Sequence, residues 1–166
     1  MSVLEGLPLV LFLDFDGVLH PVGEEALDAD FRLIANPALF CWRHILADAL
    51  APYPSVRIVV SSDWRRLFDD ENLARLLGPA LGPRVIGAVA NVEASRAGEV
   101  LAEAARRQLV HWLAIDDHPS VRAARKAGDA RFIACSSATG LSNVCVQNEL
   151  KRKLADMERH RTERIG

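Results

Sequence analysis

Apolar and polar positions alternate in blocks along this chain, and the blocks predict strands separated by helices. Residues 9–13 and 56–60 are almost entirely apolar, which is typical of strands buried on both faces of a parallel sheet. Further runs at 85–90, 109–115 and 131–135 predict three more strands. Because strands that alternate with helices indicate βαβ units, we expect an α/β fold: a three-layer α/β/α, Rossmann-like and mainly parallel sheet.

Apolar residues at helical spacing predict the helices that cover this sheet. Asn36 and Pro37 predict a helix start, with Asn36 as the N-cap and an apolar stripe that continues to Leu50. Residues 19–36 show no sustained period, so they predict a loop or short hairpin over the end of the first strand. The other predicted helices span residues 67–77, 91–109, 120–128 and 150–163.

Length, charge and cysteine usage narrow the class of protein. At 166 residues, we expect one core domain over residues 1–166. A formal net charge of -2 argues against a broad nucleic-acid-binding surface. Cys41, Cys135 and Cys145 show no metal-ligand spacing, so we expect reduced thiols. With no signal-peptide pattern and no long apolar stretch, we expect a cytoplasmic location and no membrane partner.

Three of the predicted strands end in polar residues. The carboxyl ends of parallel strands meet at one edge of the sheet, where ligands bind in open α/β folds. Carboxylates gathered there would repel one another, which normally implies a bound cation, and an all-oxygen ligand set favours Mg²⁺. The alternative for the first strand is an Asp-Gly turn that merely ends it. The three polar ends are DFDG at 14–17, SSD at 61–63 and DDH at 116–118.

In this order, the motifs resemble those of the haloacid dehalogenase (HAD) superfamily. Its pattern is DxDx[T/V] after the first strand, Ser or Thr after a later strand, a Lys or Arg, and then paired acids. The chain is particularly similar to the capless HAD domain of Swiss-army-knife RNA repair proteins, where SSxWR also follows the second motif strand. The matching residues here are Asp14, Asp16 and Val18, then Ser61, Arg96, Asp116 and Asp117, and the likeness continues through Thr139-Gly140-Leu141.

The resemblance implies a phosphomonoester hydrolase, that is, a phosphatase. Asp14 would attack phosphorus to form an aspartyl phosphate, and Asp16 would protonate the leaving oxygen and then activate water. Ser61 would hydrogen-bond the phosphoryl group, and Arg96 would offset its charge. Most members of the superfamily have Lys at this last position. Arg96 therefore departs from the pattern, and the alternative for it is a solvent-facing helix charge.

The same resemblance implies a Mg²⁺ site. The side chain of Asp14, the backbone carbonyl of Asp16 and one of the paired acids, Asp116 or Asp117, would hold the ion.

Residues next to the motifs are candidates for substrate contacts. Trp64 could stack on a ring of the substrate, or it could pack on the adjacent helix. Arg65 could bind a substrate phosphate, or it could start a solvated helix face. We expect His20 and His118 to be structural hydrogen-bonding residues. The predicted substrate-binding residues are Gly17, Ser62, Trp64 and Arg65.

The spacing of the motifs predicts an open site. About 40 residues separate Asp16 from Ser61, too few for a folded cap domain. An open site would admit a small phosphorylated molecule or a macromolecular end, such as a nucleic-acid terminal phosphate, or would use a partner protein to exclude water. The alternative function is a catalytically weak HAD-like binding or regulatory module: Arg96 in place of Lys supports it, whereas retention of Asp14 and Asp16 opposes it.

Overall fold

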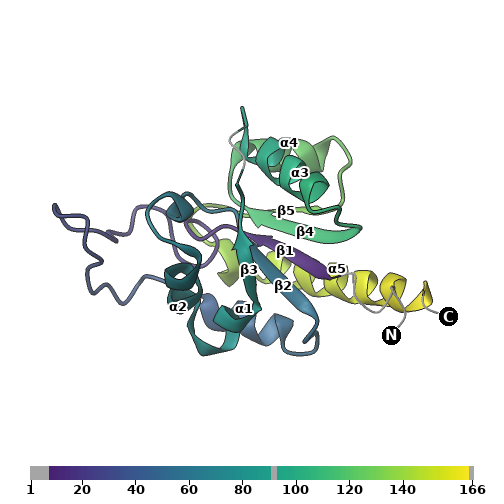
Figure 1. Cartoon of the computed structure of the whole chain (residues 1–166), viewed down its shortest axis with the longest axis horizontal. Coiled ribbons are helices and arrows are strands. Elements are labelled where there is room, and N and C mark those ends of the chain that lie inside the picture. Colours follow the sequence, from purple (N-terminus) through teal and green to yellow (C-terminus); the bar gives the residue numbers. More distant parts are fainter. Residues whose placement is uncertain (1–7, 91–92, 165–166) are drawn as a thin grey trace.

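The fold is built on a five-stranded parallel sheet with the order β3-β2-β1-β4-β5 (Figure 1). A computed structural model describes residues 8–90 and 93–164. Central strand β1 is buried along its whole length, as its unbroken apolar run predicts. The strands are β1 (Leu9–Leu13), β2 (Val56–Val60), β3 (Val85–Ala88), β4 (His111–Asp116) and β5 (Phe132–Ala134).

Helices cover both faces of the sheet and bury a separate apolar core on each. Leu11 of β1 points into the core formed with α1, α2 and α5, whereas Phe12 points into the core formed with α3 and α4. The predicted three-layer α/β/α architecture is therefore confirmed (Figure 1). The helices are α1 (Arg43–Leu50), α2 (Asp70–Leu81), α3 (Arg96–Arg106), α4 (Pro119–Lys126) and α5 (Val144–Glu163), with short 3-10 turns η1 (Asp63–Arg66), η2 (Gly82–Arg84) and η3 (Gly140–Ser142).

The first helix begins later than the sequence predicts. Asn36 does not cap it, because its side-chain oxygen accepts a hydrogen bond from the backbone of Ala38, two residues on, and forms a turn. Phe40 then adopts a left-handed backbone conformation with φ 57°, which a continuous helix excludes. The helix starts only at Arg43. The predicted start at Pro37 is therefore wrong.

Side-chain caps move three other helix boundaries. Asp69 caps α2, which continues past the predicted end through a kink at Gly78. Ser95 caps α3, so the helix predicted from residue 91 starts at Arg96; residues 91 and 92 lie outside the described part of the chain. Asn143 caps α5, which therefore begins well before the predicted residue 150. No helix in the described residues is both long and apolar enough to cross a membrane.

The segment between β1 and α1 is the predicted loop with a short hairpin. A single antiparallel bridge joins Leu27 to Leu33, and the loop extends away from the sheet (Figure 1). Phe31 lies near its tip with φ 60° and 76% of its surface exposed. The described residues of this loop form no cap domain.

Candidate active site

Three carboxylates meet at the carboxyl edge of the sheet. Asp14 directly follows β1 and Asp116 ends β4; the two strands are neighbours, with Leu13 paired to Ile115. One carboxylate oxygen from each of Asp14, Asp116 and Asp117 lies within 4.8 Å of the other two. The fold therefore brings the side chain of Asp14 together with both of the paired acids, Asp116 and Asp117, of which one was predicted to join Asp14 in holding a metal ion.

Gly17 allows the turn after β1 to approach these acids closely. Its φ of 75° lies in the left-handed region, and a Cβ atom here would lie 2.2 Å from Oδ2 of Asp117. A side chain at this position would displace Asp117 from the cluster. The structure thus gives Gly17 a packing role, and contact with substrate stays a prediction.

Burial and mutual repulsion make the cluster favourable for a cation. Burial raises the pKa of Asp14 well above its ordinary value, and the charges of Asp116 and Asp117 raise it further against the opposing effect of Arg96. Burial likewise raises the pKa of Asp116 to about 6, although the charge of Arg96 acts in the opposite direction. A divalent ion would relieve this repulsion, and the oxygen donors match the ligands that Mg²⁺ prefers.

Arg96 reaches the carboxylates from the first turn of α3. Its Nη1 atom lies 3.6 Å from Oδ1 of Asp14 and 3.4 Å from Oδ2 of Asp116, and it donates to the backbone carbonyl of Ser61. Burial acts to lower the pKa of Arg96, but Asp116, Asp14 and other nearby acids outweigh it and raise the pKa. Because Arg96 is buried, the alternative of a solvent-facing helix charge is wrong.

Glu99 is a buried acid that contacts both Arg96 and Arg65 and so fixes the position of each. Glu99 lies 3.4 Å from Nε of Arg96 and 3.0 Å from Nη2 of Arg65. The remaining nitrogens of Arg65 donate to the backbone carbonyls of Val89 and Ser61. With 6% of its side chain exposed, Arg65 is not part of a solvated face, and its donors are engaged within the protein.

Sequence reasoning missed Glu99. Its spacing from Arg96, three residues further along a helix, is a signal that could have indicated this pair.

Asp16 is fixed by two donors. Its Oδ1 lies 2.7 Å from Nε2 of His20, and its Oδ2 accepts from Nε1 of Trp64 at 2.9 Å. The backbone of Phe40 donates to Nδ1 of His20, which assigns the ring proton to Nε2 and makes His20 the donor to Asp16. Burial acts to raise the pKa of Asp16, but the hydrogen bonds from His20 and Trp64 outweigh it and lower the pKa.

Trp64 packs within the fold. Its ring stacks on Phe68 at a centroid distance of 5.7 Å, and 6% of the residue is exposed. The packing alternative therefore describes most of this ring, although part of it lines a cavity beside Asp16, and stacking on a substrate stays a prediction. The indole nitrogen orients Asp16.

The two serines after β2 are buried in different surroundings. Ser61 donates its backbone N–H to Leu13, which places it beside the end of β1. The hydroxyl of Ser62 accepts from the backbone of Trp64 and caps η1. A buried cap is a structural role, so the structure gives Ser62 no contact with the cluster.

His118 has the expected structural role. Its backbone N–H donates to Asp116 at 2.8 Å, and its ring caps α4 by accepting from the backbone of Ser120.

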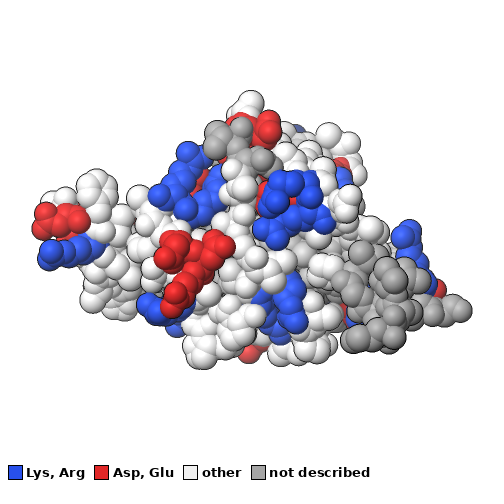
Figure 2. Space-filling view, viewed as in Figure 1, with Lys and Arg blue, Asp and Glu red and all other residues white. Residues whose placement is uncertain are grey.

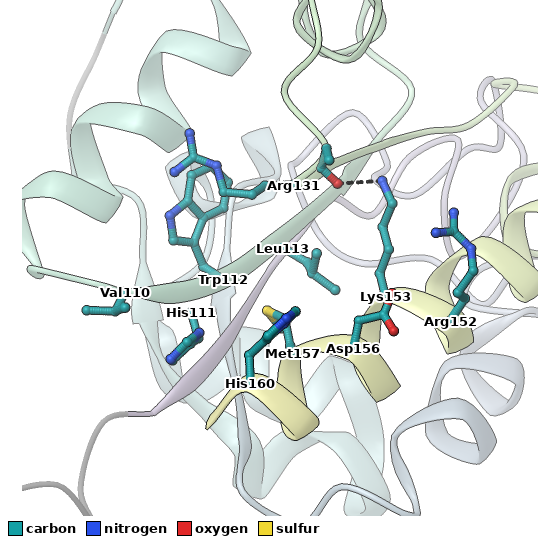
Figure 3. A pocket seen from close by; sticks show the side chains of 11 residues that line it. Val110, His111, Trp112, Leu113, Arg131, Arg152, Lys153, Asp156, Met157 and His160 are labelled. Atoms are coloured by element: carbon teal, nitrogen blue, oxygen red, sulfur yellow. Dashed lines mark hydrogen bonds between the residues drawn. The ribbon is translucent and has the colours of Figure 1, made fainter. Parts of the chain in front are cut away.

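A cavity of about 290 Å³ lies at the amino edge of the sheet, where β4 and β5 begin against α5 (Figure 3). Its lining includes Trp112, Leu113 and Met157. None of the predicted site residues contributes to it. The buried charges gather at the opposite, carboxyl edge of the sheet.

One comparison with known proteins bears on the family. A family model of the HAD domain in Swiss Army Knife RNA repair proteins matches residues 10–146. The match contains every predicted site residue, from Asp14 to Asp117, and extends into α5. No curated protein and no solved structure matches the chain.

Proposed function

Because the chain belongs to the family of HAD domains found in Swiss Army Knife RNA repair proteins, a hydrolase family, we propose that it is a Mg²⁺-dependent phosphomonoester hydrolase. The observation that carries the proposal is the cluster of Asp14, Asp116 and Asp117, whose oxygens lie within 4.8 Å of one another beside a buried Arg96. A buried excess of acid over base is costly unless a ligand compensates it.

The proposed reaction has two steps. A carboxylate oxygen of Asp14 attacks phosphorus, the bond from phosphorus to the leaving oxygen breaks, and an aspartyl phosphate forms. Water then attacks this phosphorus, the bond from phosphorus to Asp14 breaks, and Asp16 accepts one proton of the water and releases it to solvent, which returns both residues to carboxylates. The lowered pKa of Asp16 means that it begins as a carboxylate. The proton that the leaving oxygen needs would therefore arrive on the phosphate group of the substrate and pass through Asp16.

The remaining site residues would position and balance charge. The side chain of Asp14, the backbone carbonyl of Asp16 and Asp116 or Asp117 would hold Mg²⁺, which when bound stabilises negative charge on the phosphoryl oxygens. Arg96, close to both Asp14 and Asp116, would stabilise the two carboxylates in their charged form.

We propose that the substrate presents a terminal phosphate to an open site. The loop between β1 and α1 forms no cap domain over the described site, so a nucleic-acid end or a small phosphorylated molecule could enter, and a partner protein could cover the site. Lys, Arg, Asp and Glu are interspersed on the face drawn in Figure 2, which favours recognition of an end over binding along a strand. We further propose one core domain in the cytoplasm, where its three free cysteines would stay reduced.

A catalytically weak binding or regulatory module is the second candidate, and the contacts of Arg96 favour it. All three guanidinium nitrogens already contact protein groups: Nη1 contacts Asp14, Nη2 lies 3.2 Å from Asp63, and Nε faces Glu99. A guanidinium so engaged has fewer donors for a phosphoryl group than the usual lysine would offer.

A phosphate-release screen separates these functions. Wild-type protein with Mg²⁺ would be compared with Asp14→Asn on nucleotides, sugar phosphates and oligonucleotides carrying 3′ or 5′ phosphates. We expect release by the wild type and a loss of about a thousandfold or more in Asp14→Asn, with an unchanged or higher Tm because a repelling charge is removed. Release from none of the substrates, together with Mg²⁺-dependent binding of one of them, would favour the binding module.

A further inference from the structure

A cavity of about 180 Å³ opens beside Asp16, between the loop that follows β1 and the turn η1. Asp16 forms part of its wall, and 46% of that side chain is exposed. Apolar side chains form most of the remainder, among them Leu27, Leu67 and the stacked pair Trp64 and Phe68. The cavity therefore joins a carboxylate of the proposed reaction to an apolar surface.

The charged groups that line this cavity are all negative. Its described lining contains two carboxylates, Asp16 and Glu24, and no Lys, Arg or His. Glu24 accepts a hydrogen bond from the side-chain amide of Asn36 at 3.1 Å, which leaves its charge in place. The two donors to Asp16 bring no cation to the cavity wall, since His20 lies outside the described lining and the indole of Trp64 is uncharged. An anionic group in this cavity would be repelled by the two carboxylates, and the described lining offers no cation to offset that repulsion.

The position of Asp16 identifies what enters the cavity, on the assumption that the proposed function is correct. A residue that passes a proton to the leaving oxygen must lie within hydrogen-bonding reach of it. The leaving alcohol then extends from the phosphorus past Asp16 into the space beside it. We propose that this cavity selects a phosphomonoester whose leaving group is uncharged and apolar, that it disfavours a leaving group with a second anion, and that Glu24 is the specificity-determining residue.

A second hollow, of about 280 Å³, shares Phe68 with this cavity and continues past Leu33 and Leu76. The one cation in its described lining, Arg75, is paired with Glu71 at 2.9 Å. A leaving group longer than the first cavity would therefore still meet apolar and charge-balanced surface. A nucleic-acid end could use the first cavity only for its terminal nucleoside, with the next phosphate held outside.

Two substrates that differ by one charge test this selection. Phenyl phosphate and 4-carboxyphenyl phosphate share the same ring, and the carboxylate makes the phenol a slightly better leaving group, so chemistry alone favours the charged compound. We expect wild-type protein to prefer phenyl phosphate about tenfold in kcat/KM at neutral pH, because the added carboxylate faces Asp16 and Glu24. Glu24→Gln should reduce this preference severalfold. Glu25→Gln, which removes the neighbouring exposed acid outside the cavity, should leave it unchanged.

Binding to Asp14→Asn, measured by calorimetry with the same two compounds, makes the test independent of turnover. A matching preference for phenyl phosphate that Glu24→Gln weakens supports the inference, even if the wild type hydrolyses neither compound and the proposed function fails. Equal affinity for both compounds, or an equal effect of Glu24→Gln and Glu25→Gln, would overturn it.

Discussion

The two edges of the sheet handle charge in opposite ways. At the carboxyl edge, Asp14 and Asp116 are buried and share one guanidinium, that of Arg96. At the amino edge, Arg131 is 46% exposed, lies 2.7 Å from its own partner Asp129 and sits 4.2 Å above the ring of Trp112 (Figure 3). A paired and hydrated charge contributes modestly to stability, whereas a buried excess of one sign persists where a ligand or reaction requires it.

The same contrast appears in the direction of the pKa shifts. Hydrogen bonds from Arg131 lower the pKa of Asp129, so its negative charge is stabilised by folding. Burial raises the pKa of Asp116, so its negative charge is opposed by folding. One edge therefore supports the folded state at neutral pH, and the other stores unfavourable energy that a cation could relieve.

The largest expected effect is on turnover, and it comes from a substitution at the carboxyl edge. Arg96→Ala removes the guanidinium beside Asp14 and Asp116, and we expect kcat to fall by about two to three orders of magnitude, the typical range for a preorganised donor. Arg96→Lys should recover part of the loss. Arg125→Ala, which removes an exposed cation paired with Glu149, is the matched control. A near-wild-type kcat/KM for Arg96→Ala would remove Arg96 from the site.

The next effect is on stability as pH changes in metal-free protein. Between its ordinary pKa of 3.8 and its folded pKa of about 6, Asp116 keeps a proton in the folded state that the unfolded chain has lost. The free energy of unfolding should therefore fall as pH rises through this window, by an amount on the order of 2 kcal/mol. Asp14, whose pKa is raised as well, acts in the same direction.

Urea denaturation at pH 4.5 and pH 7 in the presence of a chelator measures this slope. Asp116→Asn should flatten it, and Mg²⁺ should restore stability to the wild type at pH 7. Asp129→Asn is the control from the amino edge: because the pKa of Asp129 is lowered, its contribution is lost only as pH falls below about 4, outside this window. A slope that Asp116→Asn leaves unchanged would show that the acidic cluster is not a store of unfavourable energy.

Much of the carboxyl edge could be predicted because it depends on strand pattern. The apolar run before Asp14 and the one before Asp116 each identify a buried strand, and parallel strands bring their carboxyl ends to one edge. The family resemblance confirmed by the match to residues 10–146 added the order of the motifs. The acidic cluster thus follows from local sequence and one rule of topology.

The start of α1 and the contacts of Trp64 could not be predicted, because they depend on residues that are distant in the sequence. Phe40 has a left-handed backbone conformation, and its backbone N–H donates to the buried ring of His20. Because a helix cannot continue through that conformation, α1 begins only at Arg43. Residue type alone does not determine whether Trp64 faces the substrate or the core. Its hydrogen bond to Asp16 joins two motifs that are far apart in the sequence. No local pattern determines such contacts, since they form only when the sheet is assembled.

The smallest expected effect tests whether the amino edge is only structural. Arg131→Ala removes one partly exposed ion pair with Asp129 and the contact above Trp112, so it should lower the free energy of unfolding by about 0.5–1 kcal/mol. It should leave kcat and KM unchanged, because Arg131 lies at the edge of the sheet opposite to Asp14. Lys126→Ala, which removes an exposed cation from α4, controls for loss of positive charge alone. If Arg131→Ala lowered kcat while Lys126→Ala did not, the cavity at the amino edge would take part in function, and the division between a structural edge and a chemical edge would not hold.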